Sequence, residues 1–273
     1  MNLPINQILH GDCITEMMKL PDKCVDLVIG SPPYAEKGER YGTNWAMPTS
    51  EWVPWMARVT RQAVRIARNV VVWVVNGSVK DGRYLPACEG LVWELHQQGV
   101  ICERPAIWHK NAPPSRKDWF GNDWEFCLAF RPEASTRYFD WEAIGTPPKY
   151  KAGGKFRQRS TTGARREGGE YPTNPITRPR DVIYQPDADV LRVTVGGGHL
   201  GSKLSHLNEA PYPEGVPYPF VAACCPPDGI VLDSFCGSGT TLAVAKKLGR
   251  KWIGIDVRES QVDLSGQRIA EVA

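Results

Sequence analysis

Two short segments of this 273-residue chain combine residue types that could perform chemistry together. The first is Ser-Pro-Pro-Tyr at residues 31–34, which closely follows an apolar run near the start of the chain. The second is the glycine-rich segment at residues 233–241, which follows another apolar run near its end. The first could hold an amino group on a flat ring, and the second could cradle a cofactor that carries a nucleoside.

The residue types of the first segment suit the activation of an amine on an aromatic ring. Such an amine is a poor nucleophile because its lone pair is delocalised, and acceptors around its N–H bonds localise that pair for attack on a methyl group. Pro32 and Pro33 have locked φ angles, so the carbonyl of Pro32 points in a fixed direction. Ser31 adds a side-chain acceptor, and Tyr34 offers a face for ring stacking. This would be catalysis by positioning and charge placement. The alternative interpretation is a plain Pro-Pro turn without a catalytic role, since the chain has three other proline pairs.

The second segment has the features of a turn between a strand and a helix that binds a ligand. Gly237 and Gly239 would let a ligand approach the backbone, and the following helix would offer free N–H groups. A phosphate-binding P-loop would need a lysine after Gly239, and the chain has none at that spacing. A dinucleotide-binding turn would need a third glycine where Leu242 stands. A tight turn without a ligand is the alternative interpretation.

Two acids near this turn favour one class of cofactor. Asp233 could accept a hydrogen bond from a cationic ammonium, and Asp256, at the end of the next expected strand, could accept from both hydroxyls of a ribose. A cofactor with an ammonium and a ribose suits S-adenosylmethionine better than a pyrophosphate. Together with Phe235, these residues predict a cofactor site.

The elements that must position both segments can be read from the hydrophobic pattern. Apolar runs predict strands at residues 25–29, 70–75, 106–108, 125–130, 230–232 and 252–255. Three- and four-residue spacings predict helices that begin with Ser50 as N-cap, that carry Leu85, Cys88, Val92 and Leu95 on one side, and that cover residues 217–225 and 240–248. Strands that alternate with helices predict an α/β fold with a mostly parallel sheet covered on both faces.

Residues 145–180 differ from the rest of the chain. They contain nine basic residues against two acidic ones, together with six glycines and little apolar periodicity. We expect a flexible basic insertion without packed elements. Its basic side chains could contact phosphates. The alternative is a charged loop that is only solvated. The candidate DNA-binding residues in it are Lys149, Lys151, Lys155, Arg157, Arg159, Arg165 and Arg166.

Composition excludes other classes of protein. The formal net charge of +3 is nearly neutral, so affinity for a polyanion must come from a local patch. The chain has no run of 18 apolar residues and no signal peptide, which predicts a cytoplasmic protein without a membrane span. The eight cysteines lie mostly in apolar runs without a Cys-x-x-Cys pair, so we expect buried thiols in a reducing compartment and no metal site.

Both segments in this order resemble the β class of DNA amino-methyltransferases, in which the (D/N/S)PP(Y/F) motif precedes the target-recognition region and FxGxG comes last. The resemblance covers nearly the whole chain and implies one Rossmann-like domain with a seven-stranded sheet. It divides the chain into a catalytic half (1–144), a target-recognition insertion (145–204) and a cofactor-binding half (205–273). It implies S-adenosylmethionine as cofactor. The resemblance implies that Asp12, with Cys13 beside it, contacts the adenine of the cofactor, and that Asp256 contacts the ribose. It implies that Phe235 contacts the adenosyl ring and that Asp233 and Gly237 contact the methionine portion. The remaining cofactor-binding residues lie in the turn: Gly239, Thr240 and Thr241.

The resemblance also bears on the substrate. It ties the serine form of the motif, with Ser31, mostly to the N4 amine of cytosine in double-stranded DNA, flipped out of the helix. An adenine-N6 enzyme is the chief alternative, followed by an RNA or protein-amide methyltransferase and an inactive DNA-binding module. Methylation at carbon 5 of cytosine is disfavoured, because it needs a cysteine nucleophile, typically in a Pro-Cys dipeptide. None of the 23 prolines of this chain precedes a cysteine. A partner restriction endonuclease and the oligomeric state stay open.

Overall fold

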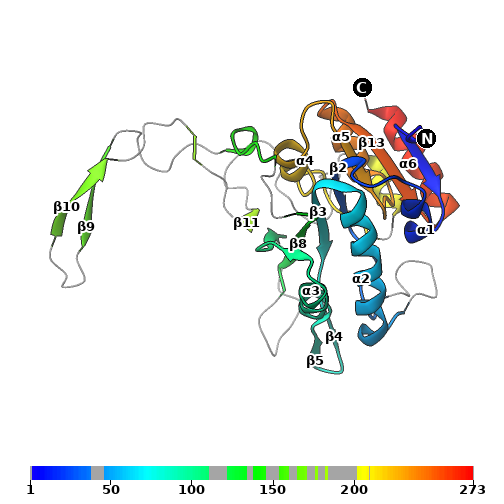
Figure 1. Cartoon of the computed structure of the whole chain (residues 1–273), viewed down its shortest axis with the longest axis horizontal. Helices are drawn as coiled ribbons and strands as arrows, with labels where there is room; N and C mark the ends of the chain where they lie inside the picture. The colour runs from blue at the N-terminus through cyan, green and yellow to red at the C-terminus, as the bar shows by residue number, and fades with distance from the viewer. Residues whose placement is uncertain are drawn as a thin grey trace.

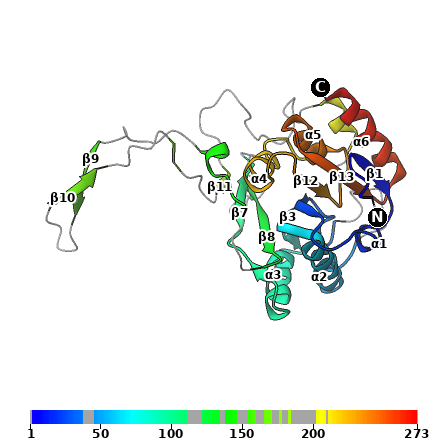
Figure 2. The same cartoon turned by 45° about the horizontal axis from the view of Figure 1, so that its top comes forward.

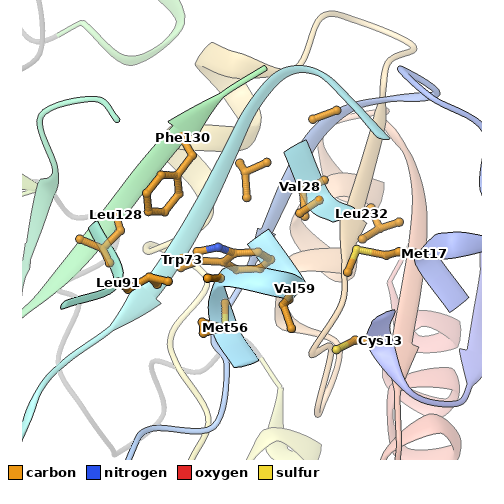
Figure 3. Close-up of a cluster of buried hydrophobic side chains, with 14 of the residues drawn as sticks. Cys13, Met17, Val28, Met56, Val59, Trp73, Leu91, Leu128, Phe130 and Leu232 are labelled. Atoms are coloured by element: carbon orange, nitrogen blue, oxygen red, sulfur yellow. The ribbon is translucent and has the colours of Figure 1, made fainter. Parts of the chain in front are cut away.

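The longest apolar run of the chain forms the centre of a sheet that is buried on both faces. It is strand β3 (Ala67–Val75), of which Ala67 and residues 69–75 are buried. Because successive side chains of a strand point to opposite faces, alternate residues of β3 pack into two separate clusters. Val71, Trp73 and Val75 belong to one cluster, which Figure 3 shows around Trp73. The unbroken run without polar alternation is therefore explained by helices on both sides.

The computed structural model describes residues 2–37, 46–110, 122–133, 138–145, 154–159, 165–170, 176–177, 182–183, 202–208 and 210–272. Within them the main sheet has the order β1-β13-β12-β2-β3-β8-β7-β11, with β6 paired to β8. Neighbours from β1 to β3 are parallel, as are β7 and β11, while β8 is antiparallel to β3, β6 and β7. The strands besides β3 are β1 (Gln7–His10), β2 (Val25–Gly30), β6 (Ile101–Cys102), β7 (Ala106–His109), β8 (Trp124–Arg131), β11 (Val182–Ile183), β12 (Ile230–Asp233) and β13 (Lys251–Asp256).

This mixed, mostly parallel α/β sheet confirms the expected fold class. Seven of its nine strands have four residues or more, and β6 and β11 add two residues each. The sheet thus has nine described strands where seven were expected, and of the two short ones β6 is antiparallel to β8 and β11 is parallel to β7.

Six helices cover the two faces of the sheet in groups of three (Figures 1 and 2). The face with Trp73 carries α1 (Cys13–Met18), α2 (Thr49–Ile66) and α3 (Ala87–Gln97). The opposite face carries α4 (Tyr218–Cys224), α5 (Thr240–Lys247) and α6 (Glu259–Glu271). Short 3₁₀ helices in the described residues include Glu142–Ile144 and Lys203–Leu207.

Two helix starts differ from the sequence prediction. Helix α2 begins at Thr49 after Pro48, so Ser50 lies inside the first turn and is not the N-cap. The N–H of Thr49 donates instead to the carboxylate of Glu36 at 2.9 Å. Leu85 belongs to a hairpin of β4 (Ser78–Lys80) and β5 (Arg83–Leu85), and α3 begins after it. In both places a contact from outside the helix decided the boundary, and the local pattern could not show it.

The basic insertion contains an ordered element that the sequence prediction missed. Strands β9 (Lys155–Arg159) and β10 (Arg165–Glu170) pair as an antiparallel hairpin, which lies apart from the main sheet in Figures 1 and 2. Its register sets Glu167 opposite Arg157 and Glu170 opposite Lys155. Both strands consist mostly of charged and polar residues, so apolar periodicity does not reveal them.

The cysteines and the helices agree with two further expectations. All eight cysteines are free thiols, seven of them buried, which confirms that they serve as small apolar residues. Within the described ranges, no helix is both long enough and apolar enough to cross a membrane.

Candidate functional site

The two chemical segments lie at the same edge of the sheet. The neighbouring strands β13, β12 and β2 are parallel, so their carboxyl ends share one edge. Asp256 ends β13, Asp233 ends β12, and Ser31 follows the last residue of β2. Ligands of open α/β sheets bind outside the carboxyl ends of the strands, so this edge is the candidate site.

Gly30 and Asp233 bring the two segments into direct contact. A Cβ atom added to Gly30 would lie 2.4 Å from Oδ1 of Asp233. Only a residue without a side chain allows the carboxylate to lie against the backbone just before Ser31. The motif at residues 31–34 and the glycine-rich turn therefore adjoin each other, as the predicted chemistry requires.

Hydrogen bonds hold the Ser-Pro-Pro-Tyr loop from outside. The indole N–H of the buried Trp52 donates to the carbonyl of Pro33 at 2.7 Å, and the hydroxyl of Ser78 donates to the carbonyl of Ala35 at 2.7 Å. Neither the carbonyl of Pro32 nor the hydroxyl of Ser31 receives a hydrogen bond from the part of the chain that the structure describes. The two acceptors predicted to hold an amine are thus the ones that the protein leaves available.

The glycine-rich turn has the backbone conformation that its sequence predicts. Gly237 and Gly239 have φ angles of +49° and +76°, in the left-handed region that favours glycine. The N–H of Gly237 donates to Oδ2 of Asp256 at 2.9 Å, and its carbonyl accepts from the hydroxyl of Ser265 at 2.5 Å. The turn leads into helix α5, whose N-terminal N–H groups face the same edge.

The two threonines after the turn hold it in place. The hydroxyl of Thr240 accepts a hydrogen bond from the fully buried guanidinium of Arg268 at 2.7 Å, and Arg268 also pairs with Glu214 at 3.0 Å. The hydroxyl of Thr241 bonds that of Tyr212. In the structure both threonines therefore support the turn from behind, which refines their predicted role.

Asp233 is a buried carboxylate in an unusual electrostatic position. It is 1% exposed and accepts the N–H of Phe235 at 3.0 Å. Burial, reinforced by the negative charge of Asp256, raises the pKa of Asp233 from 3.8 to about 7, although hydrogen bonds from Thr241, Phe235 and Tyr212 oppose the rise. Among the described residues no cation forms an ion pair with Asp233. A cationic group from a ligand would satisfy it, so the site fits the ammonium of S-adenosylmethionine.

Phe235 and Asp256 complete this part of the site. The ring of Phe235 is half-buried and meets Trp73 and Trp55 edge to face, with centroids 5.8 and 6.1 Å apart. Asp256 accepts the N–H groups of Gly237 and Arg258, at 2.9 and 3.0 Å, one on each carboxylate oxygen. A carboxylate has about four lone-pair positions, so Asp256 can still accept ribose hydroxyls.

Asp12 and Cys13 lie at the end of the neighbouring strand β1. His10 is in register with Asp256, and the N–H of Gly11 donates to the carbonyl of Asp256 at 3.0 Å. Asp12 caps α1 by accepting from the N–H and the hydroxyl of Thr15, both at 2.9 Å. The Cys13 thiol is buried, which raises its pKa to about 12. Both predicted residues are thus at the site, Asp12 at its surface and Cys13 facing the core.

The predicted DNA-binding residues are only partly described. Lys149 and Lys151 lie outside the described residues. Lys155 is exposed at the start of β9, and the remaining four belong to the β9–β10 hairpin. These four are Arg157, Arg159, Arg165 and Arg166.

Several residues of the site were not found from the sequence. Trp52, Ser78 and Arg268 act through contacts with segments far away in the chain, so no local motif marks them. Asn208 is another example, because a Cβ on Gly237 would meet its amide nitrogen at 2.4 Å. Tyr212 belongs with them, because its hydroxyl bond to Thr241 joins residues 29 positions apart.

The contact between Gly30 and Asp233 leads to a test. We expect Gly30→Ala to lower kcat/KM by about 10-fold or more, because the new methyl must displace a buried, hydrogen-bonded carboxylate. Gly266→Ala in α6 is the control, since nothing lies within 4 Å of its added Cβ. Initial rates of both variants check this. A Gly30→Ala enzyme as active as Gly266→Ala would show that the close approach is unimportant.

DNA methyltransferases from several bacteria are similar in sequence to this chain over nearly its full length. It is 28% identical over 271 residues to the Type II methyltransferase M.ScaI of Streptomyces caespitosus, covering 96% of this chain and 80% of that one. It is 25% identical over 274 residues to the DNA adenine methyltransferase YhdJ of Escherichia coli K12, covering 96% and 82%.

Solved structures share the fold. The cytosine-N4-specific PvuII DNA methyltransferase matches with a TM-score of 0.68 and 17% identity, over 97% of this chain and 90% of that one. A DNA modification methylase of Thermus thermophilus in complex with S-adenosyl-L-methionine matches with a TM-score of 0.61 and 21% identity, over 97% and 93%. A family model described as DNA methylase matches residues 25–267, which include both chemical segments. The chain therefore belongs to the N6/N4 DNA methylase family.

Proposed function

We propose that this DNA methyltransferase transfers a methyl group from S-adenosylmethionine to the N4 amine of cytosine in duplex DNA. The observation that carries the proposal is the contact between Gly30 and Asp233. It supports the proposal because the Ser-Pro-Pro-Tyr loop adjoins the glycine-rich turn, so a methyl donor bound at one could meet an amine bound at the other. S-adenosylmethionine supplies an electrophilic methyl group on a cationic sulfur.

The residues of the loop prepare the amine for attack. The hydroxyl of Ser31 and the carbonyl of Pro32 accept its two N–H bonds and localise the nitrogen lone pair. The nitrogen forms a bond to the methyl carbon as the carbon–sulfur bond breaks, and the amine releases one proton to water. Tyr34 stacks on the ring of the base and holds it in line.

The acids of the sheet edge bind the cofactor. Asp233 accepts from its ammonium, and Asp256 accepts from its ribose hydroxyls. Phe235 packs against the adenosyl ring, and Asp12 receives the adenine amine. Two observations support this assignment: the buried carboxylate of Asp233 has no ion pair among the described residues, and all three acids lie along one edge.

The basic segment contributes affinity for the DNA backbone. Lys149, Lys151, Lys155 and the arginines of the β9–β10 hairpin would contact phosphates while the target base flips into the site. The exposed position of Lys155 and the projecting hairpin support this role. A Type II relative such as M.ScaI also makes a partner restriction endonuclease a reasonable expectation.

An adenine-N6 enzyme is the second candidate, because YhdJ, named an adenine methyltransferase, is among the relatives. The neutral Ser31 favours cytosine. A hydroxyl is a weaker acceptor than a carboxylate, and the resemblance ties the serine form mostly to cytosine.

Methyl transfer from labelled cofactor tests the proposal. We expect radioactivity from S-adenosylmethionine to enter duplex DNA and to be recovered as N4-methylcytosine after digestion to nucleosides. Recovery as N6-methyladenine would reverse the choice of base. An absence of label in any DNA would overturn the function, and sequencing of host DNA for modified bases would give the recognition sequence.

A further inference from the structure

Glu125 and Lys110 form a partly buried ion pair that reaches the catalytic loop from the other half of the sheet. Glu125 lies in β8 and Lys110 directly follows β7. Their side chains are 12% and 17% exposed, and Nζ of Lys110 lies 3.0 Å from Oε1 of Glu125. The second carboxylate oxygen, Oε2, accepts a hydrogen bond from the hydroxyl of Tyr34. Both oxygens of one carboxylate are therefore engaged, one by a cation and the other by the motif tyrosine.

The direction of β8 explains why Glu125 reaches the site. Strand β8 runs antiparallel to β3, with Phe126 opposite Val75. The first residues of β8 therefore lie at the same sheet edge as the carboxyl ends of β2 and β12. The side-chain amide of Asn76, which follows β3, donates to the carbonyl of Trp124 at 2.8 Å and fixes this end of the strand. Glu125 is thus attached to a rigid part of the sheet.

Contacts from outside the loop hold Tyr34, in addition to Lys37, whose N–H donates to the Tyr34 carbonyl at 3.3 Å and whose Nζ lies 5.5 Å from the centre of its ring. The carbonyl before it, on Pro33, accepts from Trp52, and the carbonyl after it, on Ala35, accepts from Ser78. The third of these contacts is that of its own hydroxyl with Glu125. A tyrosine that served only as apolar area would not need its hydroxyl tied to a partly buried carboxylate, since removing a charge from water is costly unless it is paired.

We propose that Glu125, supported by Lys110, is a positioning residue that sets the plane of the Tyr34 ring against the target base. This inference rests on the proposed function, because the ring must stack on a flipped base. The bond at the far end of the ring fixes the direction of the ring axis, which the first side-chain torsion of Tyr34 sets. It also biases the second torsion, which sets the ring plane, because a phenol O–H prefers to lie in the plane of its ring. Strands β7 and β8 thereby support the motif tyrosine, although no catalytic motif lies in them.

Single and double variants test the inference. We expect Glu125→Gln and Tyr34→Phe each to lower kcat by about 10-fold, because a misplaced ring misaligns the amine. The cofactor Kd should stay unchanged. The double variant should be no slower than the slower single variant, since Glu125→Gln weakens and Tyr34→Phe removes the same charge-assisted bond. A merely structural role of Glu125 would give additive losses.

A matched control is the ion pair of Arg131, the last residue of the same strand. Glu103 pairs with Arg131 at 2.5 Å, with side chains 25% and 18% exposed, at the opposite end of β8. Glu103→Gln therefore removes a similar ion pair away from the site and should keep kcat within about two-fold of wild type, as expected for a change without shared partners. Thermal unfolding of all variants verifies that they fold.

The outcomes separate this inference from the proposed function. Wild-type methyl transfer together with an unchanged kcat of Glu125→Gln would overturn the positioning role alone. So would a Glu125→Gln loss that persists in the Tyr34→Phe background, because Glu125 would then act independently of the ring. Absence of methyl transfer by the wild-type enzyme would overturn the function and this inference with it.

Discussion

Replacing Asp233 by asparagine is expected to weaken S-adenosylmethionine binding by about 10²-fold or more, while the cofactor-free protein becomes more stable. The binding loss follows from removing a buried charge opposite an ammonium, which costs about 2–5 kcal/mol. The gain in stability arises because asparagine has no charge to bury, whereas burial of the Asp233 carboxylate is unfavourable and raises its pKa to about 7. Titration calorimetry and thermal unfolding without cofactor measure the two effects.

The pH dependence of the same variant has a defined sign. The folded state holds the proton of Asp233 more tightly than the unfolded state, in which the pKa is near 3.8. Unfolding free energy from this group therefore falls as pH rises from 3.8 to about 7 and stays constant above it. Asp233→Asn lacks this loss, so at a pH of about 8 it should be about 1–3 kcal/mol more stable than wild type, with little difference near a pH of about 4.

Cofactor binding should show the opposite dependence on pH. Only the ionised carboxylate attracts the ammonium, so wild-type affinity should rise until pH is above about 7. The affinity of Asp233→Asn should be insensitive to pH in this range. Asp263→Asn, an exposed change in α6, is the control for the loss of one negative charge. A variant that is both less stable and unchanged in cofactor affinity would make Asp233 a structural residue.

Replacing Ser31 by alanine is expected to lower kcat by about 10²-fold, the scale measured when one donor to a transition-state oxyanion is removed. The hydroxyl has no hydrogen bond within the described residues, so its loss should leave folding and cofactor affinity unchanged. Single-turnover rates with saturating DNA measure the effect. Ser31→Thr keeps an acceptor at this position and should recover part of the rate.

A second serine provides the comparison for this variant. Ser50 is exposed in the first turn of α2, so Ser50→Ala should have the wild-type rate. Equal rates for Ser31→Ala and Ser50→Ala would exclude the hydroxyl as an acceptor. The carbonyl of Pro32 would then carry the contact alone.

The parts of the fold with strong local patterns were predictable from the sequence. The buried run of β3, the strands β2, β12 and β13, and the glycine turn before α5 all lie where the apolar runs and glycines predict them. Parallel strands buried on both faces need continuous apolar runs, and a left-handed turn favours glycine. These requirements act within a few residues, so they are visible in the sequence.

Contacts between distant segments were decided by the tertiary structure. Glu36 sets the start of α2 across 13 residues, Trp52 fixes the carbonyl of Pro33 across 19, and Glu125 holds Tyr34 across 91. Each contact joins groups whose separation depends on the path of the chain, and no local spacing encodes it.

The sequence by itself thus determined which groups could do the chemistry: acceptors at Ser31 and Pro32, a stacking ring at Tyr34, and acids at Asp233 and Asp256. Their types and their places after apolar runs are local properties. Only the tertiary structure decided that Asp233 lies against Gly30, that its charge is buried without a cation among the described residues, and that β8 supplies the support for Tyr34. The physical reason is that burial, pKa and alignment arise from neighbours that folding brings together.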